Sequence, residues 1–273
     1  MKILIAADME GITGVVTWDQ VTPGHFEYHR FRELMTADVN AAVQGAFEAG
    51  AQDVTVTDGH SMGANILIED LDPRVRLNCG SPSPYSMMQG IEEVDGVMFV
   101  GYHARAGTPA AILDHTWSSR CVRNVWLNDV LVGEYGLNAA LAGYFDVPVL
   151  MVSGDQNACA QVVELLGEVV ETAVVKQALG RFAAECLSPQ SAQAVIRQAA
   201  VRAVKKLKEG KAAEPFHFPG SIRLRVEFAS SDMVDRATQH SGVAREGTCV
   251  SVLAEDMPEA YRSFRGLVAL AAG

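Results

Sequence analysis

The residues best suited to chemistry are acidic and histidine side chains that follow predicted strands. In open α/β sheets, ligands bind where the carboxyl ends of parallel strands meet, so we expect these side chains to lie at one edge of a sheet. A lone Asp-x-Glu is more often a turn former or a helix cap, but the same placement after four predicted strand segments favours a shared site. The five candidates are Asp8, Glu10, His60, His103 and Glu134.

Three carboxylates and two imidazoles exceed what one metal ion with an open position needs from the protein. The set therefore predicts two divalent ions that share one bridging carboxylate. Asp8 is the predicted bridge, since it has the shortest acidic side chain and comes first after the strand. If the strand continued through Glu10, both carboxylates would point the same way. Mixed nitrogen and oxygen ligands favour Zn²⁺, with Co²⁺ or Mn²⁺ allowed.

Three further residues complete the predicted site. His115 lies twelve residues beyond His103, where it can reach a reacting group without binding metal, and we assign it the role of catalytic acid or base. Arg105 and Asn138 are weaker candidates for contacts with the substrate. The metal pair would generate hydroxide near neutral pH and polarise a carbonyl, and His115 could donate a proton to a leaving amine.

Alternating strand and helix patterns predict the elements that position these residues. We expect an α/β fold with a mostly parallel sheet, helices on both faces and a smaller C-terminal α+β portion. The predicted division is a catalytic domain at 1–209, a Gly- and Pro-containing linker at 210–220, and the small portion at 221–273. The expected strands include 2–7, 54–57, 96–102 and 148–152, with a hairpin of 122–127 and 130–132.

Composition excludes several classes of partner. The chain has 273 residues, 22 Lys and Arg against 33 Asp and Glu, and a formal net charge of −11. This charge opposes binding to nucleic acid. No apolar run is long enough for a membrane helix, and Asp8 interrupts the first apolar segment before a signal peptide could form. The five cysteines are scattered and odd in number, which predicts a cytoplasmic protein.

Several co-linear motifs resemble the M55 family of metallopeptidases. The likeness runs from Met1 to about Leu187 and continues more weakly to the end. The motifs that carry it are Asp8–Ile12, Asp58–Ser61, Gly101–Ala106, Gly133–Ala139 and Asp146–Val152.

The resemblance implies a two-zinc aminopeptidase that releases N-terminal D-amino acids, such as D-Ala, from short peptides. It assigns Asp8, Glu10 and His103 to one zinc and Asp8, His60 and Glu134 to the other. His115 matches the catalytic histidine of the family, which is described there as the nucleophile, whereas the chemistry of the residues favours attack by hydroxide. The resemblance also implies a ring-shaped homodecamer whose active sites face an internal channel.

The flanks of His115 depart from the family pattern. Asp114 and Thr116 stand where small hydroxyl residues are expected, and the extra carboxylate would raise the pKa of His115 or alter the choice of substrate.

Three alternatives to a D-aminopeptidase remain at this point. The first is an L-specific aminopeptidase or amidase of the same family. The second is a non-catalytic ring stabilised by metal. The third is a phosphatase of the haloacid-dehalogenase type, suggested by Asp8-x-Glu10 and Gly154-Asp155. The phosphatase leaves the histidines without a role.

Overall fold

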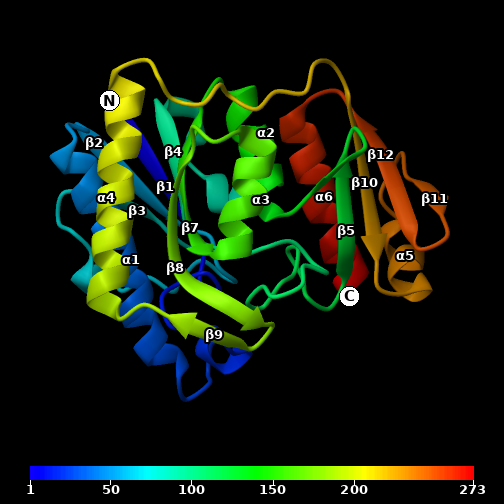
Figure 1. Cartoon of the computed structure of the whole chain (residues 1–273). Helices are drawn as coiled ribbons and strands as arrows, with labels where there is room; N and C mark the ends of the chain where they lie inside the picture. Colours follow the sequence, from blue (N-terminus) through cyan, green and yellow to red (C-terminus); the bar gives the residue numbers. More distant parts are fainter.

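The computed structural model describes residues 1–273 and contains two β-sheets with helices packed against them (Figure 1). The strands of the first sheet are β1 (Lys2–Ala7), β2 (Asp53–Asp58), β3 (Arg76–Asn78), β4 (Gly96–Tyr102), β7 (Val149–Asp155), β8 (Glu171–Gly180) and β9 (Ala183–Cys186). Their order is β3-β2-β1-β4-β7-β8-β9, and only β9 runs antiparallel to its neighbour.

Helices cover both faces of this sheet, as the sequence predicted. The helices are α1 (Tyr28–Glu48) and α4 (Pro189–Lys208) on one face, and α2 (Glu134–Tyr144) and α3 (Gln156–Leu166) on the other. Successive side chains of a strand point to opposite faces. Accordingly, Ile3 and Ile5 of β1 pack with α1 and α4, whereas Leu4 and Ala6 pack in the cluster that contains α2 and α3.

The second sheet is antiparallel and joins distant parts of the chain. Its order is β11-β12-β10-β5-β6. The strands are β5 (Val122–Leu127), β6 (Val130–Val132), β10 (Ile222–Phe228), β11 (Ala244–Glu246) and β12 (Cys249–Ala254), and the helices α5 (Ser231–Ala237) and α6 (Met257–Ala272) follow in the same segment. No helix of the structure combines the length and the apolar character needed to cross a membrane.

This pairing bears on the predicted division into 1–209, 210–220 and 221–273. The connection between α4 and β10 contains no helix or strand and crosses from one sheet to the other (Figure 1). However, β10 pairs with β5, so the C-terminal segment shares a sheet with residues from the predicted first domain. The proposed boundaries stay a prediction, and any division must keep β5 and β6 with the last segment.

A buried lysine on strand β8 binds the segment that follows β1. Lys176 of β8 is 1% exposed, and its Nζ donates to the carbonyl oxygens of Glu10, Ile12 and Val15 at 2.7, 2.8 and 2.8 Å. Burial lowers the pKa of Lys176 to about 8, and the carboxylate of Asp155 opposes that shift. The ammonium therefore persists at neutral pH and fixes a segment that has no regular secondary structure.

We expect Lys176→Met to lower the free energy of unfolding by about 3–5 kcal/mol, because it leaves three carbonyl groups without their donor. Urea unfolding of the metal-free protein measures the change. Lys205→Met removes an exposed lysine from α4 and serves as the control, with an expected change within about 0.5 kcal/mol. Equal stability of the two variants would contradict the anchoring role of Lys176.

Candidate metal centre

The structure brings all five predicted ligands and His115 to the carboxyl edge of the first sheet. Asp8 and Glu10 follow β1, His60 follows β2, and His103 follows β4. Glu134 is the first residue of α2, and His115 lies between β4 and β5. Each of the six side chains belongs to a residue at most 9% exposed.

One part of the predicted geometry is wrong. Strand β1 ends at Ala7, so Asp8 and Glu10 do not share the face of a strand. Instead, the chain turns over the end of β4, where the Asp8 amide donates to Val100 O at 2.8 Å and the Gly11 amide donates to Gly101 O at 2.7 Å. A Cβ at Gly11 would lie 2.0 Å from Tyr102 O, so this close approach requires glycine.

Short contacts link the carboxylates to the imidazoles. His60 Nδ1 lies 3.2 Å from Asp8 Oδ1 and 3.1 Å from Glu10 Oε2. His103 Nε2 lies 3.4 Å from Asp8 Oδ2 and 3.0 Å from Glu134 Oε1. Asp8 therefore lies between the two histidines, one oxygen toward each.

Each of the three histidines has one ring nitrogen fixed by a main-chain carbonyl. A carbonyl oxygen only accepts hydrogen bonds, so the nitrogen that faces it carries the hydrogen. The other nitrogen of each ring then faces the carboxylates, an orientation typical of histidines that bind metals. The pairs are His60 Nε2 with Val21 O at 2.8 Å, His103 Nδ1 with Ala104 O at 3.0 Å, and His115 Nδ1 with Leu113 O at 2.8 Å.

Three buried atoms of the cluster have no hydrogen-bond partner, namely Asp8 Oδ2, Glu10 Oε2 and His103 Nε2. Buried polar atoms without partners are costly, and each of these is a good ligand for a divalent cation. Suitable atoms of Asp8, Glu10 and His103 all lie within 4.8 Å of one another, and so do those of His103, His115 and Glu134. The donor set of nitrogen and carboxylate oxygen fits Zn²⁺.

The charges of the cluster shift its pKa values in a consistent direction. Burial alone would raise the pKa of Asp8, but the neighbouring imidazoles of His103 and His60 hold it well below its usual range. Burial alone would lower the pKa of His60, but Glu10 and Asp8 raise it well above the ordinary value. The carboxylates thus demand positive charge, which either protons on the imidazoles or metal ions can supply.

His115 has a different environment from the other two histidines. Its ring stacks on His103 with centroids 4.0 Å apart, and Trp18 contacts it edge-on at 5.4 Å. Its Nε2 lies 3.7 Å from Glu134 Oε1 and 3.9 Å from Glu10 Oε1. Burial and the charge of His103 lower its pKa, which favours the neutral form of the ring.

The expectation that Asp114 raises the pKa of His115 is wrong. The Asp114 carboxylate points to other partners, since it accepts from Arg181 Nε at 2.9 Å and from the Gly107 amide at 2.7 Å. The negative charge of Asp114 is therefore neutralised by Arg181 and not by the imidazole of His115.

A cavity of about 590 Å³ opens over the cluster, and its walls include Asp8, Glu10, His60, His115 and Glu134. Arg105 and Asn138, the predicted substrate contacts, do not line it. Asn138 is fully buried, donates to Tyr102 OH at 2.8 Å and accepts from Tyr261 OH at 2.9 Å. Its amide is therefore occupied by packing contacts. Sequence reasoning missed the lining residues Trp18, Trp117, Arg120 and Arg265.

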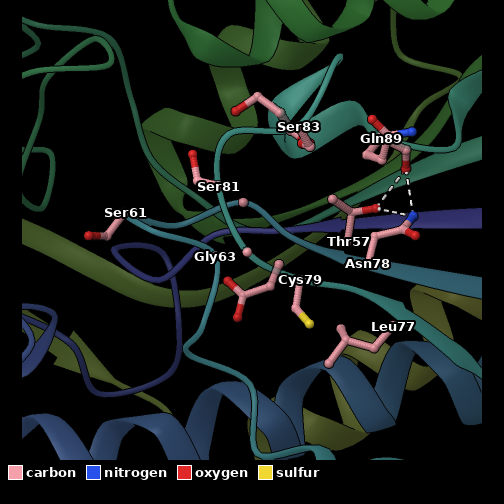
Figure 2. A pocket seen from close by; sticks show the side chains of 13 residues that line it. Thr57, Ser61, Gly63, Leu77, Asn78, Cys79, Ser81, Ser83 and Gln89 are labelled. Carbon is pink, nitrogen blue, oxygen red and sulfur yellow. Dashed lines mark hydrogen bonds between the residues drawn. The ribbon is translucent and has the colours of Figure 1, made fainter.

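A second, polar pocket of about 240 Å³ adjoins this cavity (Figure 2). The two share Gly59, Ser61, Ser81 and Ser86. At its inner end, the side-chain amide of Asn78 donates to Thr57 Oγ1 at 3.1 Å and to Gln89 O at 2.9 Å. This pocket extends the cavity along the ends of β2 and β3.

Comparison with known proteins identifies the family. The model of the Peptidase_M55 family, described as D-aminopeptidase, matches residues 1–266. The chain belongs to the M55 peptidase family. The chain is 38% identical to the D-aminopeptidase of Bacillus subtilis (strain 168) over 274 residues. The alignment covers 99% of this chain and 98% of that protein.

A solved member of the M55 family has the same fold throughout. The Zn-dependent D-aminopeptidase DppA from Bacillus subtilis, a self-compartmentalizing protease, superposes with a TM-score of 0.95 at 37% identity. The match covers 100% of this chain and 98% of DppA. The α/β fold, the M55 family and the D-aminopeptidase class of hydrolase are thereby confirmed, and the phosphatase alternative is set aside. The individual ligands stay a prediction.

Asp8→Asn should reduce bound zinc from about two ions per chain to less than one, because Asp8 contacts both metal-facing histidines. The amide nearly preserves the shape of the side chain but removes its charge. Metal analysis after gel filtration measures the content. Asp70→Asn, which changes an exposed carboxylate, is the control and should keep the wild-type content. Full zinc content in Asp8→Asn would exclude Asp8 as the bridge.

Proposed function

We propose that this chain is an aminopeptidase with two zinc ions that removes N-terminal D-amino acids, such as D-Ala, from short peptides. The observation that carries the proposal is the convergence of three buried carboxylates on the ring nitrogens of His60 and His103 that face away from the main-chain carbonyls. The zinc dependence of the related DppA supports the choice of metal. Co²⁺ and Mn²⁺ suit the same ligands.

The proposed ligand sets are Asp8, Glu10 and His103 for one ion and Asp8, His60 and Glu134 for the other. The mutual proximity of Asp8, Glu10 and His103 supports the first set. The contact of His60 with Asp8 at 3.2 Å supports the second. The shortest contacts of the two glutamates cross these sets, since Glu10 lies nearest His60 and Glu134 nearest His103.

When bound, the two ions would activate water and polarise the scissile carbonyl. The task left to the protein is to move the proton that the departing amine needs. His115 Nε2 faces the cavity side of the cluster while Nδ1 is held by Leu113 O, so Nε2 is the nitrogen that takes up and returns the proton. Stacking on His103 and contact with Trp18 restrict the ring to this orientation. A nucleophilic His115 is the second candidate role.

We further propose that the protein forms a homo-oligomeric ring that encloses its active sites. The description of DppA as a self-compartmentalizing protease supports an enclosed assembly, and the family resemblance suggests a decamer. Enclosure would restrict substrates to short peptides. A cytoplasmic location is part of the same proposal and rests on the cysteine pattern of the sequence.

Hydrolysis of matched D-Ala and L-Ala dipeptides and p-nitroanilides, after zinc is returned to metal-free protein, tests the activity. We expect turnover of the D series alone. His115→Ala should retain its zinc but lose about 10²–10⁴-fold in kcat, since it removes the proton-transferring group. His29→Ala alters an exposed histidine of α1 and should leave both quantities unchanged.

Each part of this proposal has its own contrary result. Comparable turnover of L substrates would favour the L-specific alternative while keeping the metal centre. Wild-type turnover by His115→Ala would remove His115 from the reaction. Tightly bound zinc with no hydrolysis of any amide would favour a structural role for the metals.

A further inference from the structure

Two arginines line the cavity that opens over the metal centre. Among the residues that form its walls, Arg120 and Arg265 are the only ones with a permanent positive charge. The remainder of the charged wall consists of Asp8, Glu10 and Glu134. The cavity is therefore acidic where the predicted metals bind and carries guanidinium groups elsewhere on its surface.

Arg120 has a guanidinium group without a protein partner. The residue is exposed, and its side chain forms no hydrogen bond, ion pair or cation–π contact in the structure. The adjacent turn is nevertheless anchored, because the Ser118 carbonyl accepts from the Cys121 amide at 3.2 Å and the Trp117 amide donates to Glu134 Oε1 at 2.7 Å. Arg120 is thus a free cation on a loop fixed to the metal centre.

Arg265 is held in place but keeps donors available. Its Nη1 donates to the carbonyl oxygens of Ser83 and Pro84, each at 2.8 Å, which ties α6 to the loop between the two pockets. The Nε and Nη2 hydrogens have no partner in the structure, and the residue is half-buried. A guanidinium fixed in this way can still bind a carboxylate through two parallel hydrogen bonds.

We propose that Arg120 and Arg265 form a binding site for the free C-terminal carboxylate of the peptide substrate. The inference rests on the proposed function, which places the N-terminal residue and the scissile bond at the metal centre. A short peptide is a zwitterion, so its other end carries a negative charge. On a chain of net charge −11, an anion needs local cations to bind, and these two arginines supply them inside the cavity.

The position of Arg120 suits the carboxyl end of a short peptide. A chain segment spans at most about 3.3–3.6 Å per residue, so the Arg120 Cα lies within about 11 Å of the Trp117 Cα beside Glu134. An extended peptide of two or three residues covers a similar distance. Arg120 therefore lies close enough to the predicted metal centre to meet the free carboxyl end of a dipeptide or tripeptide.

The test compares hydrolysis of D-Ala-D-Ala with that of its C-terminal amide by the zinc-loaded protein. We expect the wild type to prefer the free acid by about tenfold to hundredfold in kcat/KM. Arg120→Met should lose most of this preference through a higher KM for the acid, with the amide changed less than about threefold. Arg265→Gln removes the charge of the second guanidinium, and it should act in the same direction.

Arg262→Met is the matched control, because it removes an exposed arginine of α6 that does not line the cavity. It should leave the ratio of acid to amide unchanged. Equal efficiency of the wild type toward acid and amide would overturn the carboxylate site but leave the aminopeptidase intact. An equal loss on both substrates in Arg120→Met would also overturn it. Failure of the wild type to hydrolyse either substrate would overturn the proposed function itself.

Discussion

Three buried carboxylates face imidazole nitrogens, and such a group of acidic side chains cannot stay in contact without positive charge from protons or metal ions. This requirement explains much of the local structure. Main-chain carbonyls fix the outer nitrogens of the rings, glycine at position 11 lets the chain cross the end of β4, and Lys176 holds the segment that carries Glu10. Each contact limits how far the acidic groups can move apart.

The first sheet and its ligands could be predicted because both follow from local sequence. Strands β1 and β4 are nearly continuous apolar runs, as expected for parallel strands covered on both faces, and their predicted bounds agree with the structure. Since parallel strands end at one edge, a polar residue after each strand was sufficient to gather the candidate ligands.

Other features depend on contacts between distant segments, which one sequence does not reveal. The sequence around Lys176 does not show that its ammonium binds three carbonyl groups near the N-terminus of the chain. Asn138 adjoins the predicted ligand Glu134 on α2, but two tyrosines occupy its amide. Arg120 and Arg265 belong to a loop and a C-terminal helix that are far apart in the sequence, and both line one cavity. Such roles follow from the fold and not from residue type.

The central claim is that Asp8 bridges two zinc ions at the carboxyl edge of the first sheet. Diffraction from zinc-loaded crystals at wavelengths on either side of the zinc absorption edge tests it directly, because the anomalous signal locates zinc without assumptions about ligands. The account predicts two peaks per chain, about 3.5–4 Å apart, with Asp8 between them. A single peak, or peaks away from Asp8, His60 and His103, would contradict it.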